Sequence, residues 1–222
     1  MLILKEIKKV AKDYLFPIFC LGCGVEGCWV CESCKNRFEV VDSTEFFDKK
    51  MSNIKVLFSA LQYYEESLLG KAFKIFKYEF SEEVFGLFES IILKYFEIRL
   101  EYFKNIDFII PVPLHPRKYA ERGFNQSEMI AQVVGKILNK AVLNDAIYRI
   151  RYTKNQARLN KSEREDNIKN AFELNKKYYF SNKVVLLIDD VYTTGATIHE
   201  CSQLFENKKV KGIYAFTLFR GR

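Results

Sequence analysis

Residues 184–200, which read VVLLIDDVYTTGATIHE, constrain the fold of this chain more than any other stretch. The first five form an apolar run rich in β-branched residues, typical of a strand buried on both faces of a parallel sheet. Asp189 and Asp190 stand at the carboxyl end of this run, and a loop of small residues leads from them into a helical run from Ile198. This order predicts an α/β fold with a ligand site at the carboxyl end of the strand.

The loop after the two acids has the composition of a phosphate cradle. Gly195 lets the backbone approach a ligand closely, and the neighbouring hydroxyl and N–H groups can donate to phosphate oxygens at the positive end of the following helix. The candidate phosphate ligands are Thr193, Thr194, Gly195, Ala196 and Thr197.

Asp189 and Asp190 would repel a phosphate, so we expect them to face another part of the ligand. Carboxylates only accept hydrogen bonds, which suits a vicinal diol, and a divalent cation would ease their mutual repulsion. A phosphate at one end and a diol at the other describe a ribose 5-phosphate. The alternative is a buried strand that ends in a solvated turn and a helix cap, since the same residue types suit both.

This stretch resembles the signature of the type I phosphoribosyltransferases, in which an apolar strand, two acids and a threonine and glycine loop bind 5-phosphoribosyl 1-pyrophosphate. The resemblance implies a mostly parallel sheet flanked by helices, and a ligand that binds together with Mg²⁺. It also implies that Asp189 and Asp190, the candidate catalytic residues, take the ribose hydroxyls, while residues 193–197 hold the 5-phosphate. Any activity would be that of a glycosyltransferase.

A second buried strand is predicted over residues 106–112, where Pro111 and Pro113 end it. The basic stretch RKYAERGFNQ then leads into an amphipathic helix that is predicted to run to about Leu138. A basic turn with a glycine before a helix gives a second anion site, which would hold pyrophosphate if it adjoins the first. Its candidate residues are Arg122, Gly123, Asn125 and Gln126.

Residues 153–170 are polar, charged and long for a connection, as functional lids and disordered segments often are. Because arginine forks match phosphate oxygens, we interpret this segment as a lid over a bound pyrophosphate, with disorder as the alternative. Its candidate residues are Gln156, Arg158, Lys161, Arg164 and Asn167. We interpret His115 as a residue at the rim of the site and His199 as a structural residue.

Elsewhere the hydrophobic pattern predicts a strand over residues 54–64, two helices over residues 68–80 and 82–103, and a final strand over residues 213–219. Residues 1–16 are predicted to form a docked amphipathic helix. Residues 1–45 would then hold this helix and a zinc ribbon, and residues 46–222 the phosphoribosyltransferase-like domain.

Five of the six cysteines are crowded between residues 20 and 34, which indicates a metal site in a chain without a recognisable export signal. Two Cys-x2-Cys pairs can deliver four thiolates to one tetrahedral zinc. The predicted ligands are Cys20, Cys23, Cys31 and Cys34. Cys28 forms a further pair with Cys31 and is the alternative to a terminal ligand. We predict a structural role for the zinc, with nucleic-acid contact through Trp29, Lys35 and Arg37 as the alternative.

The chain carries a net charge of +7, and residues 117–169 alone contribute +6, from twelve Lys or Arg against six Asp or Glu. Positive surface of this kind attracts phosphates, so we predict non-specific binding of single-stranded DNA, with a solvated basic face as the alternative. Hydrophobic residues make up 49% of the chain, which indicates a folded protein, and no apolar run approaches the roughly 20 residues of a membrane span. A cytoplasmic location is expected.

Several motifs together resemble the ComF family of competence proteins. They are CLGC, CESC, PVPLHPRKYAERGFNQSEMIA, the stretch from TKNQARL to REDN, and VVLLIDDVYTTGAT, which together cover most of the chain past Pro17. The resemblance implies a cytoplasmic protein needed for DNA uptake in natural transformation. Such a protein would act where incoming single-stranded DNA leaves the membrane channel, beside a helicase-like partner.

Three hypotheses follow. The first is a DNA-uptake protein that binds phosphoribosyl pyrophosphate or a related sugar phosphate. The second is a nucleobase salvage phosphoribosyltransferase of unknown acceptor. The third is a zinc-stabilised nucleic-acid or partner-binding module with a vestigial sugar-phosphate site, which the intact Asp189 and Asp190 disfavour.

Overall fold

The computed structural model describes residues 17–38, 40, 43–47, 53–79, 81–153 and 167–221. The described residues pack as two compact units. One combines the cysteine segment with Tyr64–Phe88, and the other combines residues 40–63 with residues 89–222. The segmentation into residues 1–45 and 46–222 stays a prediction, because units of packing do not by themselves define domains. The helix predicted for residues 1–16 lies outside the described residues.

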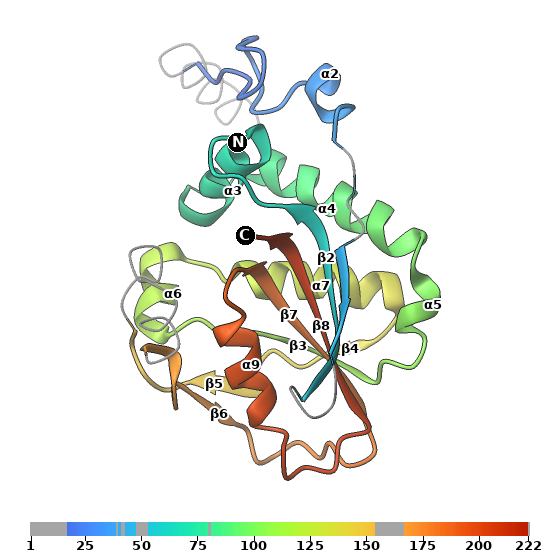
Figure 1. The fold of residues 1–222 in the computed structure, drawn as a ribbon. Helices are drawn as coiled ribbons and strands as arrows, with labels where there is room; N and C mark the ends of the chain where they lie inside the picture. The colour runs from blue at the N-terminus through green and yellow to red at the C-terminus, as the bar shows by residue number, and fades with distance from the viewer. Residues whose placement is uncertain are drawn as a thin grey trace, which may run out of the picture. The chain divides into compact units, whose positions relative to one another are not determined.

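The larger unit is built on a six-stranded sheet (Figure 1). In spatial order its strands are β1 (Ser43–Phe46), β2 (Ile54–Gln62), β8 (Gly212–Arg220), β7 (Val184–Tyr192), β3 (Phe108–Pro111) and β4 (Ala141–Val142). Neighbouring strands run parallel except at the β1–β2 edge, where they are antiparallel. The predicted fold class, a mostly parallel sheet flanked by helices, is confirmed.

The predicted strands are all present, although their bounds differ from those predicted. β7 continues four residues past Ile188, because β8 is equally long and pairs with it as far as Tyr192. β3 is shorter than predicted and starts only at Phe108. β8 lies inside the sheet between β2 and β7, which explains why its residues are almost all buried.

Helices cover both faces of this sheet (Figure 1). On one face, α7 (Gln126–Leu138) packs so closely that a Cβ added at Gly135 would lie 2.5 Å from the Val142 side chain. The same face takes Phe96 of α4 (Glu82–Glu97), whose ring centroid lies 4.9 Å from that of Phe216. α5 (Leu100–Phe103) follows α4 directly and divides the second predicted helix in two.

The opposite face of the sheet is covered by α9 (Ala196–Gln203) and by a second, two-stranded sheet. Ile198 and Cys201 of α9 are buried in one apolar cluster with alternate side chains of β7, such as Leu187. The small antiparallel sheet consists of β5 (Ile147–Arg149) and β6 (Phe172–Leu174), and it contributes Ile147 and Phe172 to the same cluster. The sequence did not predict these two strands.

The smaller unit contains the cysteine segment with α2 (Glu32–Lys35), α3 (Leu68–Tyr78) and the start of α4. Ser67 begins α3, because its Oγ accepts a hydrogen bond from the Gly70 N–H over 3.0 Å. Phe73 and Phe76 of α3 pack against Phe88 of α4, with ring centroids 6.3 and 5.5 Å apart. Within the described residues, no helix combines the length and the apolar character that crossing a membrane requires.

The connections from β3 and β7 diverge, although the two strands are neighbours. The chain passes from β3 through α7 to β4 on one side, and from β7 through α9 to β8 on the other. Adjacent parallel strands with diverging connections leave a crevice outside their carboxyl ends, and α/β sheets bind ligands there. The residues that follow β3 and β7 are therefore the candidates for a functional site.

Candidate functional site

The two acids lie in β7 beyond the end of its neighbour β3. The last residue of β3 pairs with Ile188. From Asp189 onward, β7 therefore extends past the end of β3. Its Oδ1 accepts hydrogen bonds from the Ser127 hydroxyl over 3.0 Å and from the Asp190 N–H over 2.9 Å. These bonds hold the Asp189 carboxylate toward the start of α7. Asp190 is buried and points to the other face, because side chains alternate along a strand.

Gly195 forms the turn from β7 into α9. Its φ of +79° lies in the left-handed region, and it is the N-cap of the helix. A Cβ at this position would lie 2.4 Å from the Tyr192 hydroxyl oxygen, so only glycine fits without a shift. Thr194 Oγ1 accepts from the Ala196 N–H over 3.4 Å. Residues 193–197 thus lead directly to a helix N-terminus, the arrangement that a phosphate cradle needs.

His199 lies one turn into α9 and contacts residues around this loop. Its Nε2 is 3.5 Å from the Tyr192 hydroxyl, and its ring meets Phe47 edge-on with centroids 5.9 Å apart. Both contacts agree with the structural role that we predicted for His199.

The basic stretch after β3 forms a short helix where we predicted a turn. α6 (Pro116–Arg122) begins after His115, whose Nδ1 accepts from the Arg117 N–H over 3.2 Å, and it ends at Gly123 with φ of +80°. The physical reason is that proline suits the first helical position and glycine suits a left-handed cap. His115 therefore caps a helix.

Asn125 and Gln126 make contacts inside the fold. Asn125 caps α7 by accepting from the Ser127 N–H over 3.1 Å, and it donates through Nδ2 to the Val112 carbonyl over 3.0 Å. Gln126 is buried, and its Oε1 accepts from Nη1 of Arg122 over 3.3 Å. These bonds tether the residues after α6 to the end of β3. Direct ligand contact by Arg122, Gly123, Asn125 or Gln126 stays a prediction.

The sequence predicted a pyrophosphate site only if the two anion loops adjoin. The structure places these two loops next to each other. β3 and β7 pair directly, and Ser127 at the start of α7 bonds Asp189 of β7. Ser127 was not predicted, because nothing in the sequence marks a partner 62 positions away.

The candidate residues of the predicted lid fall mainly on the part of the chain that is not described. Gln156, Arg158, Lys161 and Arg164 lie outside the described residues. Asn167 is described, and its carbonyl accepts from Nη2 of Arg151 over 3.0 Å; the same nitrogen donates to the Lys169 carbonyl. Arg151 precedes the predicted lid, so these bonds connect the chain before the lid to residues near its far end.

The four predicted zinc ligands converge. The Sγ atoms of Cys20, Cys23, Cys31 and Cys34 all lie within 4.8 Å of one another. Tetrahedral Zn–S bonds of about 2.3 Å place sulfur atoms roughly 3.8 Å apart, so this cluster needs little adjustment to hold the ion. The residues present therefore fit a structural zinc site. Cys28 is not part of the cluster, as predicted.

The electrostatics of the cluster favour a cation. Burial opposes ionisation of Cys20, but backbone N–H groups, that of Cys31 first, outweigh it and lower the pKa of Cys20 to about 6. Burial and the adjacent thiols of Cys31, Cys20 and Cys23 raise the pKa of Cys34 to about 12. Several thiolates this close repel one another unless a cation lies between them.

A residue far along the chain supports the second cysteine pair. Glu83 Oε1, in the first turn of α4, accepts from the Trp29 N–H over 2.9 Å and from the Val30 N–H over 3.5 Å. These two N–H groups immediately precede Cys31, so the Glu83 carboxylate fixes the backbone that presents this ligand.

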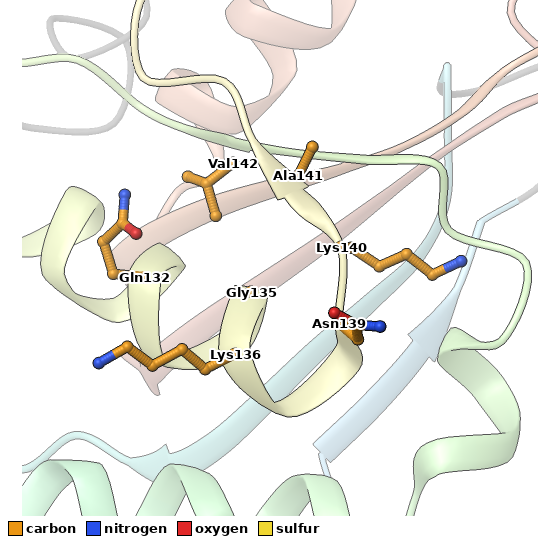
Figure 2. A pocket seen from close by; sticks show the side chains of 7 residues that line it. All are labelled: Gln132, Gly135, Lys136, Asn139, Lys140, Ala141 and Val142. Carbon is orange, nitrogen blue, oxygen red and sulfur yellow. The ribbon is translucent and has the colours of Figure 1, made fainter.

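A separate pocket lies between α7 and the edge strand β4 (Figure 2). It has a volume of about 490 Å³, and its lining residues are Gln132, Gly135, Lys136, Asn139, Lys140, Ala141 and Val142. None of the predicted site residues lines it. It lies where β4 begins, whereas the candidate site lies where β3 and β7 end.

Comparison with known proteins finds that part of this chain is similar to bacterial competence and DNA-utilization proteins. No family model matches it. "Competence protein F" of Haemophilus influenzae is 38% identical over 113 residues, which are 50% of this chain and 49% of that protein. "DNA utilization protein YhgH" of Escherichia coli is 34% identical over 114 residues, 51% of this chain and 49% of that protein. "Competence protein ComFC" of Streptococcus pneumoniae is 33% identical over 135 residues, 60% of this chain and 57% of that protein.

These relatives confirm the resemblance to the ComF family over the matched residues, and the chain spans about half the length of the curated relatives it matches. Among solved structures, adenine phosphoribosyltransferase from Leishmania donovani aligns over 73% of this chain and 83% of its own, with a TM-score of 0.41 and 12% identity. The enzyme from Leishmania tarentolae aligns over 80% and 94%, with a TM-score of 0.39 and 13% identity.

Proposed function

We propose that this chain is a competence or DNA-utilization protein that binds phosphoribosyl pyrophosphate, or a related sugar phosphate, with Mg²⁺. The role in competence rests on the names of the relatives, and the ligand rests on the site. The observation that carries the ligand is that two loops suited to anions follow adjacent strands, β3 and β7, where their connections diverge, with Asp189 and Asp190 between them.

Each part of the ligand has a matching part of the site in this proposal. Residues 193–197 at the start of α9 take the 5-phosphate through hydroxyl and N–H donors. Asp190 and Asp189 accept from the ribose hydroxyls, with Mg²⁺ to offset the charge of two carboxylates. Arg122 and the turn at Gly123 face the pyrophosphate, since guanidinium groups pair well with phosphate oxygens.

A structural zinc in the four-cysteine cluster and single-stranded DNA as a partner complete the proposal. The zinc would hold together a segment whose own apolar core is small. The DNA would bind through its phosphates to the basic region within residues 117–169. A helicase-like competence protein and the membrane DNA channel stand as further proposed partners, and the proposed location is cytoplasmic.

The proposal is tested by isothermal titration calorimetry with phosphoribosyl pyrophosphate and Mg²⁺ on the wild type and on Asp190→Asn. Loss of a charged hydrogen bond costs about 1.5 to 3 kcal/mol, so the affinity should fall roughly 10- to 100-fold. Asp145→Asn is the control, since the partners of Asp145 are Lys177 and Tyr178. An unchanged affinity in Asp190→Asn would remove the acids from the site.

A second measurement separates the proposed function from nucleobase salvage. The protein is incubated with phosphoribosyl pyrophosphate, Mg²⁺ and each common nucleobase in turn, and released pyrophosphate is measured. A salvage enzyme should release pyrophosphate with one base, whereas a DNA-uptake protein that only binds the ligand should not.

A further inference from the structure

Arg149 is a buried cation that the proposed function does not use. It lies at the end of β5, and the residue is 9% exposed. Nη2 donates to Thr153 Oγ1, and the guanidinium carbon lies 5.2 Å from the centre of the Phe172 ring. The Nε atom is buried, and no acceptor for it is present among the described residues. One N–H of the guanidinium group is therefore left without an acceptor among the described residues.

Charged groups of both signs act on Arg149. Asp189 attracts it, whereas Arg151 and Arg122 repel it. Burial lowers the pKa of Arg149. The buried thiol of Cys201 is also close, but burial raises the pKa of that thiol well above its usual range, so it is neutral and supplies no counter-charge.

A buried guanidinium without a full set of acceptors is costly, because it has lost the hydrogen bonds that water would make. Asp189 cannot serve it alone, since one oxygen of that carboxylate already accepts from Ser127 and from the Asp190 N–H. A phosphate oxygen would supply the acceptor that Nε lacks, and its negative charge suits a guanidinium group. The packing on Phe172 and the bond to Thr153 also fix the side chain before any ligand arrives.

We propose that Arg149 is a ligand-binding residue of the crevice between β3 and β7, where it acts with Arg122 and Arg151 on a pyrophosphate group. The inference rests on the proposed function for the identity of the complete ligand, but the pyrophosphate itself can be tested alone.

The test is calorimetric titration of inorganic pyrophosphate with Mg²⁺ into the wild type, Arg149→Met and Arg149→Lys. Arg149→Met should weaken binding roughly 10- to 100-fold, and Arg149→Lys should lie between, because lysine keeps the charge but not the fork. Arg99→Met is the matched control: Arg99 is also buried, and its guanidinium lies 4.3 Å from the centre of the Tyr95 ring, near the end of α4. Equal affinities in Arg149→Met and Arg99→Met would overturn the proposal.

A second measurement follows the wild-type protein during the titration and needs a variant only to assign one resonance. The ¹H–¹⁵N resonance of the Arg149 Nε–H, assigned by its absence in Arg149→Lys, should shift when pyrophosphate and Mg²⁺ are added. A resonance that stays in place at saturating pyrophosphate would show that the group serves packing alone.

The role of Arg149 and the proposed function can be contradicted independently of each other. If the wild type binds phosphoribosyl pyrophosphate in an Asp190-dependent way and Arg149→Met binds it equally well, the arginine proposal is wrong and the function stands. If pyrophosphate binding depends on Arg149 but Asp190→Asn leaves phosphoribosyl pyrophosphate binding unchanged, the anion site stands and the assignment of the ribose to the two acids is wrong.

Discussion

The Ser127 hydroxyl donates a hydrogen bond of 3.0 Å to Oδ1 of Asp189, which joins the start of α7 to the acid pair of β7. Ser127 is buried and follows the Asn125 cap by two residues, so the helix start fixes its position. The bond orients one of the two carboxylates proposed to face the ribose. It also couples the loop after β3 to the loop after β7.

We expect Ser127→Ala to weaken the binding of phosphoribosyl pyrophosphate with Mg²⁺, because Asp189 loses a donor that holds its side chain. A hydrogen bond of this kind contributes about 1 kcal/mol or somewhat more, which corresponds to a roughly 5- to 10-fold loss of affinity. Ser202→Ala is the matched control, since Ser202 is equally buried but bonds the His199 carbonyl within its own helix. Calorimetry on both variants decides, and equal losses would mean that the Ser127 bond has no specific role.

Gly195→Ala should damage the proposed phosphate loop. The residue has a left-handed φ, and an added Cβ would meet the Tyr192 hydroxyl at 2.4 Å, so the loop must shift at a cost of about 1 to 3 kcal/mol. Gly86→Ala is the control, because Gly86 lies within α4 with open space around an added Cβ, and alanine favours a helix by up to about 1 kcal/mol. Thermal unfolding should show opposite shifts, and a stable Gly195→Ala protein with unchanged affinity would contradict the assignment.

One zinc per chain is expected, and Cys28→Ser should retain it while Cys34→Ser loses it. The reason is that only the Cys34 sulfur belongs to the four-atom cluster. Metal content of purified variants, measured by plasma mass spectrometry, checks this. Zinc should also bind more tightly as pH rises, since protons compete for thiols and the pKa of Cys34 without a cation is about 12. Zinc loss in Cys28→Ser would return Cys28 to the ligand set.

Glu83→Ala should lower zinc affinity although Glu83 is not a ligand. Its carboxylate accepts from the two N–H groups ahead of Cys31, and loss of outer-shell support of this kind costs about 10-fold in metal affinity. Glu82→Ala, a change at the neighbouring residue of the same helical turn, serves as control. Competition with a chromophoric chelator gives the affinities, and Glu83→Gln should retain part of the support because it keeps one oxygen acceptor.

Binding of single-stranded DNA should weaken steeply with salt, because each neutralised phosphate releases counterions with a slope of about 0.7 per contact. Fluorescence anisotropy of a labelled strand over a salt series measures this for the wild type, Arg122→Ala and Lys161→Ala. Lys104→Ala is the control, since Lys104 pairs with Glu101 outside the basic region. Saturating phosphoribosyl pyrophosphate should displace the DNA if the two sites coincide. Absence of binding at low salt would leave the basic region to a small ligand alone.

The sequence determined those parts of this protein that depend on neighbours along the chain. The apolar run before Asp189, the loop that contains Gly195 and the helix that follows were predictable, because short-range sterics and burial set them. The same holds for the choice of Cys20, Cys23, Cys31 and Cys34 over Cys28, since spacing in two knuckles governs which sulfur atoms can converge. The α6 helix was missed, although Pro116 and Gly123 carried its start and end signals.

Only the tertiary structure decided which distant residues meet. That β3 lies beside β7 brings the two loops together, although β3 and β7 are far apart along the chain. The positions of Ser127 and Glu83 depend on hydrogen bonds across 62 and 54 residues, to Asp189 and to Trp29, respectively. No local pattern encodes such contacts, because they form only when separate elements are buried against one another and their polar groups must find partners there.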